Sequence, residues 1–496
     1  MQLQFDSKPF RCLQYALQET VELEEVLELR IPETGEITIL CAKGQPLLRG
    51  KDWHGDRAGV TGGVAVSVLY LNEEGIAGSC DGWLPFQKAW TIPCDGKDGV
   101  LSVCCSLCNL DARLTGADKV MVTVSLSLSV AAYVPAIIQL PSADDLPEDI
   151  HLLRKSYPVC VPVEAGERSM PFEEEMVLPP GKADIRQLLH ASLQCGTMEQ
   201  KPMADKLVFR GAASVKVLYL GVDGGVDAAF LTLPVSQYVQ LEHIYGAEAE
   251  AALTLAVTNL ETERLENGRL RVKGSLVGQY VICDRPLVEL VEDAYSNQRS
   301  VAVEHQSLPM TQLLAGKELM RSLQTAVSVR AESVVCSDVY YKQPHISSQG
   351  EKFLLHTEGT VQLLYYGEDG RLQCVCTPWQ LSQEESAGEQ VRLSAEIKSV
   401  GNMQLTASDD GVAAAWDMQL VETAWQNAGL PASTGLKVEE KTAPEGRRPA
   451  LILRKAGEYS LWELAKFCGS SMEAIRKANQ LSEDPAADRM LLIPVE

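Results

Sequence analysis

The sequence predicts a mainly β protein in which three antiparallel β-sandwich-like domains precede a small β-α-α-β domain. The first observation behind this prediction is a repeated stretch, in which strand-favouring residues containing Leu-Tyr meet an acidic turn that glycine closes. It occurs three times, at Tyr70, Tyr219 and Tyr365, about one small domain apart. The second observation is that the apolar and polar alternation typical of half-buried strands gives way after residue 449 to helix-start signals.

Composition and charge limit the class of protein. The chain of 496 residues is long enough for three or four domains, and its 46% hydrophobic and 22% charged residues are ordinary for globular proteins. The formal net charge of -23 would repel nucleic acid and anionic membrane surfaces. We see neither a basic and apolar signal segment after Met1 nor an apolar run long enough to span a membrane. We therefore expect no nucleic-acid partner, no membrane span, and a protein that stays in the compartment where it is made.

The 14 cysteines raise the question of disulfides or a metal site. Cys104, Cys105 and Cys108 form the only close group, and no second cysteine or histidine pair follows at the spacing of zinc ligands. Without an export signal, we expect reduced thiols that pack as small hydrophobic residues.

The first β unit is expected within residues 1–140. Its clearest strand candidate, residues 120–130, alternates between the two faces of a strand at nearly every step. Further strands are expected at residues 26–31, 35–41, 63–71, 84–90 and 100–110. Because an isolated hairpin is marginal in water, these strands must pack two faces together.

The same order of strands recurs in residues 169–287 and 288–429, which we expect to form the second and third units. The second unit is expected to have strands at 173–178, 211–220, 233–239, 251–260 and 270–282, with at most a short helix such as 183–193. The third is expected to have strands at 363–366, 377–381, 391–400 and 412–421. Residues 141–168 and 430–448 are expected to be linkers, with a further connection near 291–299, and proline and glycine are frequent in 430–448.

The C-terminal residues 449–496 have the pattern of a strand, two helices and a strand. Ser460 and Ser470 each begin an S-x-x-E capping box, which is a strong signal for the start of a helix. The apolar stripe of the first helix is expected to end at Gly469, and the second helix is expected to end near Asn479. The expected stripes are Leu461, Leu464, Ala465 and Cys468 in the first helix and Met472, Ile475 and Ala478 in the second. The flanking strands are expected at 450–453 and 491–494.

This unit resembles a LysM domain, and the match rests on residues 460–466, 475–481 and 491–494. LysM modules bind glycans that contain N-acetylglucosamine, through the loop before the first helix and the loop after the second. The resemblance therefore implies a ligand- or partner-binding site on these two loops. Its candidate residues are Gly457, Glu458, Tyr459, Ser460, Leu461, Trp462, Asn479, Gln480 and Leu481.

The first of these loops departs from the usual LysM pattern. Such loops commonly carry Gly-Asp-Thr before Leu-Trp, whereas this chain has one extra residue between Gly457 and Leu461 and lacks the Asp-Thr pair. Two interpretations of the aromatic residues remain open here. Tyr459 and Trp462 either contact a ligand or are only rim and core residues of the domain.

The three β units in turn resemble the SPOCS (DUF3794) domain of spore-forming Firmicutes. The match rests on the Leu-Tyr strand, the acidic glycine turn, and a following strand that contains Pro85, Pro234 or Pro378. Three such domains followed by one LysM domain are similar to the SipL-type spore morphogenesis proteins. The resemblance implies a non-catalytic scaffold in the mother-cell cytoplasm, at the forespore surface. It also implies that the LysM domain docks the morphogenetic ATPase of the coat's basement layer.

Two other classes of function were compared with this scaffold. A protein that binds peptidoglycan or cortex glycan would have to be exported, and no export signal is seen. An enzyme would need paired carboxylates or a Cys/His or metal arrangement, and the common phosphate-loop, serine-hydrolase and zinc-protease motifs do not occur. The 67 acidic residues gather mainly in turns, where solvation explains them, and no calcium-loop pattern is present. We therefore expect no catalytic residue, metal or cofactor.

Overall fold

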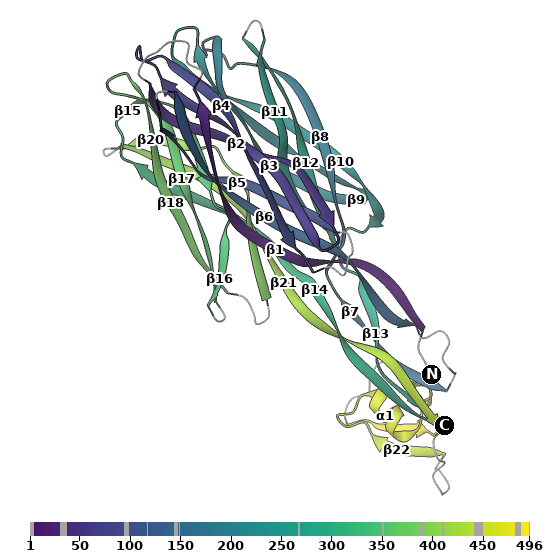
Figure 1. Ribbon diagram of the computed structural model, residues 1–496. Coiled ribbons are helices and arrows are strands. Elements are labelled where there is room, and N and C mark those ends of the chain that lie inside the picture. Colours follow the sequence, from purple (N-terminus) through teal and green to yellow (C-terminus); the bar gives the residue numbers. More distant parts are fainter. Residues whose placement is uncertain are drawn as a thin grey trace.

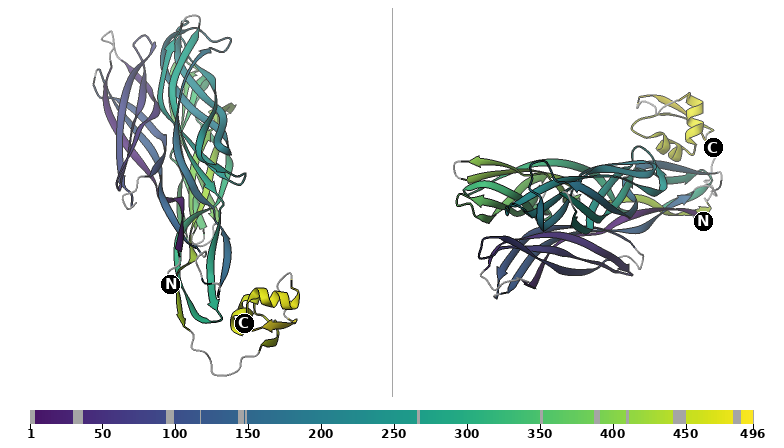
Figure 2. Two further views of the ribbon diagram at one scale, coloured as in Figure 1. Left: turned by 90° about the vertical axis from the view of Figure 1, so that its right-hand side faces the viewer. Right: turned by 90° about the horizontal axis from the view of Figure 1, so that it is seen from above.

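The computed structural model describes residues 4–29, 37–93, 99–116, 118–142, 147, 149–265, 268–349, 352–386, 391–408, 411–440, 450–481 and 488–495. Over these residues it confirms the mainly β class, because strands dominate and the two helices both lie near the C-terminus (Figure 1). Neither of these two helices is long and apolar enough to cross a membrane. Three β domains form an elongated body, which narrows into a stalk with the small C-terminal domain at its end (Figures 1 and 2).

The first β domain has two three-stranded antiparallel sheets, with the strand orders β1-β6-β5 and β2-β3-β4. Their bounds are β1 (Gln4–Glu28), β2 (Thr38–His54), β3 (Arg57–Leu71), β4 (Ala77–Thr91), β5 (Val100–Leu114) and β6 (Lys119–Ser142). Every second residue of β6 from Val120 to Val130 is buried, in one core with β3 residues such as Val64 and Val66. The alternation at residues 120–130 thus predicted both this strand and its buried face.

The other two β domains repeat this connectivity. In each domain the first and last long strands pair, and an edge strand completes the sheet, giving β8-β12-β11 in the second domain and β14-β21-β19 in the third. The remaining pairs are β9 with β10 in the second domain, β17 with β15, β16 and β18 in the third, and β20 with β21. The bounds in the second domain are β8 (Val161–Val177), β9 (Ile185–Gly221), β10 (Val226–Tyr245), β11 (Glu250–Arg264) and β12 (Arg269–Asp284). Those in the third domain are β14 (Arg299–Val327), β15 (Ala331–Tyr341), β16 (His345–Gln349), β17 (Lys352–Gly367), β18 (Leu372–Ser386), β19 (Val391–Val400), β20 (Gln404–Ser408) and β21 (Gly411–Glu440).

The turn after the repeated Leu-Tyr stretch has the same geometry in all three domains. Gly75, Gly224 and Gly370 have positive φ angles of 77°, 85° and 70°, in the left-handed region that glycine adopts without steric cost. Each of them donates its N–H to the carbonyl three residues earlier, at 2.9–3.1 Å. The acidic glycine turn predicted from the sequence is therefore present in every copy.

The three domains meet at a shared buried junction. Leu69, Leu218 and Leu364, which are the leucines of the three repeated stretches, belong to one hydrophobic cluster. The tyrosine that follows each leucine packs instead into the core of its own domain. Because adjacent residues of a strand point to opposite faces, one dipeptide serves both a domain core and the contact between domains.

An ion cluster lies at the same junction, with one member from each domain. Asp338 of β15 accepts a hydrogen bond from Lys216 of β9 at 2.6 Å and forms an ion pair with Lys43 of β2. The side chain of Lys43 is only 3% exposed, and that of Asp338 is 16% exposed. The body is thus held together by apolar packing and by charges that no single domain supplies.

The helix expected at residues 183–193 is wrong, since these residues lead into and form the start of strand β9. Ile185, Leu189 and Leu193 are the buried residues of this stretch. A spacing of four places residues on one side of a helix, but it also places them on one face of a strand. The two ends of β9 lie side by side, because Val222 just after β9 donates its N–H to the carbonyl of Asp184 just before it, at 2.9 Å.

Much of the expected linkers is strand as well. Residues 141–168 contain β7 (Ile150–Pro158) and the start of β8, and residues 430–440 complete β21, whereas 441–449 lie outside the described residues. The connection expected near 291–299 is largely occupied by β13 (Leu287–Ser296). Pro431 is tolerated in β21 because this part of the strand pairs with β14 alone, so its other edge needs no proline N–H.

The stalk is built from these unexpected strands. β7 and β13 pair antiparallel, and the far ends of β14 and β21 pair beside them, beginning with Arg299 opposite Glu440. Ile150, Ala294 and Leu436 form a small buried cluster that joins β7, β13 and β21. The stalk therefore has its own apolar contacts, and it carries the C-terminal domain at its end (Figure 2).

The C-terminal domain has the β-α-α-β order that the sequence predicts. It consists of β22 (Leu451–Lys455), α1 (Leu461–Cys468), α2 (Met472–Asn479) and β23 (Met490–Pro494), and β22 pairs antiparallel with β23. The four predicted stripe residues of α1 are buried, and Gly469 ends α1 in a left-handed conformation with a φ of 68°. In α2, Ile475 is buried and Met472 is partly buried, but Ala478 is exposed, so the third position of that stripe is wrong.

The two helix caps differ. Ser460 forms the complete capping box, because its hydroxyl accepts the Glu463 N–H and the Glu463 carboxylate accepts the Ser460 N–H. The cap of α2 is Ser471, whose hydroxyl accepts the Ala474 N–H at 3.1 Å. The capping box expected from Ser470 is therefore wrong by one residue, because Ser471 has the extended backbone and the hydrogen bond of the N-cap.

Candidate functional site

The first helix of the C-terminal domain lies against strand β13 of the stalk. Trp462 donates its indole N–H to Asp293 at 2.8 Å, and its ring packs edge-on against Tyr295 with centroids 4.7 Å apart. Lys466, one turn further along α1, forms an ion pair with Asp293 at 2.7 Å. The hydroxyl of Tyr295 donates to the Ser470 carbonyl at 2.8 Å. Tyr295 is 5% exposed and belongs to the core cluster of the C-terminal domain, so the stalk supplies part of that core.

The charge of Asp293 holds this contact together. Partial burial works to raise the pKa of Asp293, but hydrogen bonds from Lys466 and Trp462 outweigh it, and the pKa lies below its ordinary value. Asp293 is therefore an ionised acceptor for two donors on α1. This contact fixes which side of the helix remains available to other molecules.

The loop before α1 presents its one aromatic residue to solvent. Gly457 begins the loop with a φ of 66°, Tyr459 is 55% exposed, and Ser460 is committed to capping α1. The guanidinium of Arg454 in β22 lies 5.3 Å from the centroid of the Tyr459 ring. It also lies 4.9 Å from the centroid of the Phe467 ring, which is 79% exposed. We call this arrangement of Tyr459, Arg454 and Phe467 the aromatic-arginine stack.

The loop after α2 has mainly structural contacts. The side-chain amide of Asn479 donates to the Leu492 carbonyl at 2.5 Å and accepts the Leu492 N–H at 2.8 Å, so it joins α2 to β23. Gln480 is exposed and ends α2 with a φ of 49°, and Leu481 is half-buried beside the domain core. Among the hydrogen bonds of the described residues, none connects this loop with residues 457–460.

The candidate residues thus fall into different environments. Leu461 and Trp462 are 1% and 6% exposed and are engaged within the chain, whereas Tyr459 and Glu458 face solvent. Sequence reasoning did not identify Arg454 and Phe467. The sequence did contain a signal for Phe467, because this large apolar residue lies outside the apolar stripe of α1 and is therefore expected to face solvent. Asp293 and Tyr295 had no such signal, because they lie far away in the sequence.

The stack can supply aromatic faces and a guanidinium at one surface. Such groups stack on the apolar faces of sugars and dominate contacts between proteins, where tyrosine and arginine are enriched among the strongest contributors. Among the described residues, no group of three or more His, Cys, Asp or Glu side chains is arranged to hold a metal ion. Thirteen described cysteines are free thiols. Burial raises the pKa of Cys105 to about 12, which makes this thiol unreactive near neutral pH.

No protein-family model, curated protein or solved structure matches this chain.

Proposed function

We propose that this chain is a non-catalytic scaffold of spore envelope assembly, which docks coat morphogenetic proteins to the forespore surface through its LysM-like domain. It would act in the mother-cell cytoplasm, with the morphogenetic ATPase of the basement layer as its partner. The observation that carries the proposal is the aromatic-arginine stack, which leaves Tyr459 and Phe467 exposed while Trp462 is held by the chain's own stalk.

The arrangement of the domains supports a docking role. The LysM-like domain lies at the end of a stalk, away from the three β domains (Figure 2). A partner can therefore reach the stack without contacting the body. Because the Asp293 and Tyr295 contacts hold α1 on the stalk, a bound partner would be kept in a defined position relative to the scaffold.

The test measures binding of the purified basement-layer ATPase to the full chain and to the variants Tyr459→Ala and Phe467→Ala. We expect each variant to bind roughly tenfold or more weakly, as hot-spot truncations do. Tyr238→Ala is the matched control, since Tyr238 on β10 is also exposed and also has a cation, Lys206, over its ring at 5.2 Å. Unchanged affinity of both stack variants contradicts the proposed docking site.

Glycan binding is the rival outcome. Sedimentation with purified peptidoglycan that is abolished by Tyr459→Ala and not by Tyr238→Ala, together with no binding of the ATPase, would assign the stack to glycan recognition and overturn the scaffold proposal.

A further inference from the structure

A large cavity lies between the three β domains. Its volume is about 1350 Å³, and strands of all three domains line it. Ligand pockets in proteins commonly measure roughly 300–1,000 Å³, so the space is large enough for more than a small metabolite. It is far from the aromatic-arginine stack along the chain, and none of the described residues of the LysM-like domain lines it.

The cavity meets the edges of strands and not their faces. Eight consecutive residues of β11, from Glu250 to Val257, line it, and so do all ten residues of β19. Since successive side chains of a strand alternate between faces, a cavity above a sheet would be lined by every second residue. Among the strands that the structure describes, β11 pairs only with β12, and β19 pairs only with β21. Each of these strands therefore turns its edge away from its own sheet and towards the cavity.

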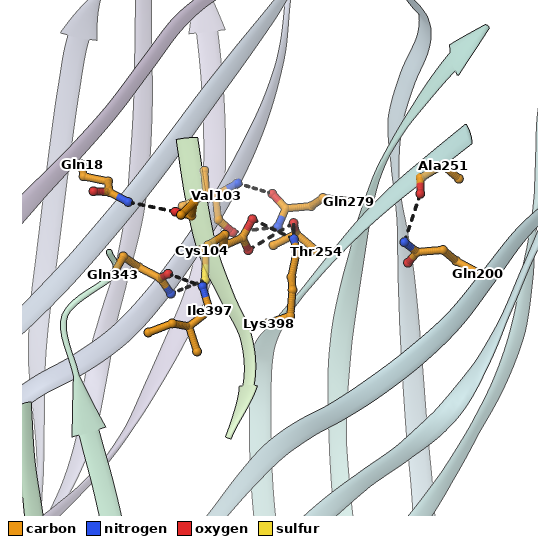
Figure 3. A network of polar contacts seen from close by, with 12 residues as sticks. Gln18, Val103, Cys104, Gln200, Ala251, Thr254, Gln279, Gln343, Ile397 and Lys398 are labelled. Carbon is orange, nitrogen blue, oxygen red and sulfur yellow. Dashed lines mark hydrogen bonds and ion pairs between the residues drawn. The ribbon is translucent and has the colours of Figure 1, made fainter. Parts of the chain in front are cut away.

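Side-chain amides already pair with strand edges around this space (Figure 3). Gln279 accepts the Val103 N–H and donates to the Val103 carbonyl, both at 2.8 Å, as the peptide groups of an adjacent strand would. Gln200 donates to the Ala251 carbonyl on β11 at 3.0 Å. Gln343 accepts the Ile397 N–H on β19 at 2.9 Å. The edges thus use their backbone groups to bind amides at several positions.

β11 and β19 are joined across the cavity by side chains alone. Lys398 of β19 donates to the Thr254 hydroxyl of β11 at 2.8 Å and forms an ion pair with Glu396 at 2.7 Å (Figure 3). Leu253 and Leu255, the neighbours of Thr254 on β11, also line the cavity, and so do charged residues such as Glu250. The walls carry both apolar and polar side chains, and an extended segment suits them because it offers backbone amides to the strand edge and side chains to both kinds of wall.

We propose that this cavity binds an extended segment of a partner protein, which adds as a strand to the edge of β11. The backbone N–H and C=O groups of the segment pair with β11, and its alternate side chains contact the cavity walls. This site is separate from the LysM-like domain, so the protein would hold two partner segments at two places.

The test selects a display library of random decapeptides on the full chain. Selected peptides are expected to bind through their backbone, so methylation of alternate amide nitrogens in one of the two registers should weaken binding at least tenfold. The cavity variant is Gly316→Trp, because Gly316 lines the cavity and a Cβ there meets no atom within 4 Å. Gly246→Trp is the matched control, since Gly246 has equal space but does not line the cavity.

We expect Gly316→Trp to abolish binding of the selected peptides and Gly246→Trp to preserve it. Backbone hydrogen exchange of residues 250–257 should slow when a selected peptide is added to the full chain. The proposal is overturned if the library gives no peptide whose binding Gly316→Trp removes, or if binding tolerates N-methylation in both registers. If exchange at β11 instead slows without peptide as the protein concentration rises, the occupant is a second copy of this chain. That result also overturns the proposal.

Discussion

His190 illustrates how one half-buried residue can depend on all three β domains. Its Nδ1 lies 3.1 Å from the hydroxyl of Ser67, which itself donates to Asp81 at 2.7 Å. Since the hydroxyl proton points to Asp81, the histidine Nδ1 carries the proton that bonds Ser67. Burial, opposed by the charge of Asp338 and aided by the charges of Lys43 and Lys216, lowers the pKa of His190 from 6.5 to about 3. The ring is therefore neutral within the junction.

This pKa predicts an acid-sensitive fold. Below pH 6.5 the unfolded chain takes up a proton at His190 that the folded chain, with a pKa of about 3, does not. Stability should therefore fall as the pH drops from 6.5 towards 3, by up to about 1.4 kcal/mol per pH unit from this residue. Urea unfolding at pH 7 and pH 5 measures the effect, which should shrink in His190→Gln. The exposed residue provides the control: His54→Gln should keep the pH dependence of the unchanged chain. An equal pH dependence in all three proteins contradicts the assignment.

At the scale of elements, the caps of the two short helices show where a local sequence signal and the structure differ. An isolated helix of eight residues is too short to be stable in water, so α1 and α2 depend on caps and on tertiary packing. The sequence offers Ser470 and Ser471 as alternative caps for α2. In the structure Ser471 caps the helix, whereas the buried hydroxyl of Ser470 has no hydrogen-bond partner.

The two serines should therefore respond in opposite ways to alanine. Ser471→Ala should cost about 1 kcal/mol of the stability of the C-terminal domain, because the Ala474 N–H loses its acceptor. Ser470→Ala should be neutral or stabilising, because it removes a buried polar group without breaking a hydrogen bond. Hydrogen exchange of residues 461–479 in the full chain measures both variants. A loss with Ser470→Ala that equals or exceeds the loss with Ser471→Ala contradicts the assigned cap.

At the scale of the whole molecule, the three domains share buried charges. Such charges would destabilise a single domain that lacked their partners. Burial works to raise the pKa of Asp338, but Lys216 and Lys43 outweigh it and hold the pKa well below its ordinary value. Burial works to lower the pKa of Lys43, but the charge of the same carboxylate helps to raise this pKa above its ordinary value. Each charge is compensated only when all three domains are assembled.

Removing the shared carboxylate should therefore weaken the whole body. Asp338→Asn leaves two ammonium groups without their anion, and breaking a buried pair in this way costs about 3–5 kcal/mol. Glu384→Gln is the control, because its ion pair with Lys352 is about two-thirds exposed on both sides and should contribute less than about 1 kcal/mol. Denaturant unfolding followed by fluorescence compares them. If the two losses are equal, the Asp338 cluster does not join the domains.

The sequence by itself determined the strands whose faces alternate, the three glycine turns and the order of the C-terminal domain. In each case the signal is local, because the pleat of a strand, a positive φ and a helix cap are properties of a few neighbouring residues. Residues 120–130 and Ser460 are the clearest examples. Trp462 is 6% exposed and Tyr459 is 55% exposed, so one lies in the core and the other at the rim, and a ligand contact of Tyr459 stays a prediction.

Only the tertiary structure decided what the local signals could not. Residues 183–193 are a strand because β9 packs among other strands, although the spacing of their apolar residues suits a helix equally well. The expected linkers are largely strands because β7 and β13 find partners more than a hundred residues apart. The tertiary structure alone also decides that Trp462 contacts Asp293 and that strand edges surround the central cavity. These features depend on which distant segments meet, and a single sequence contains no local physical signal for that choice.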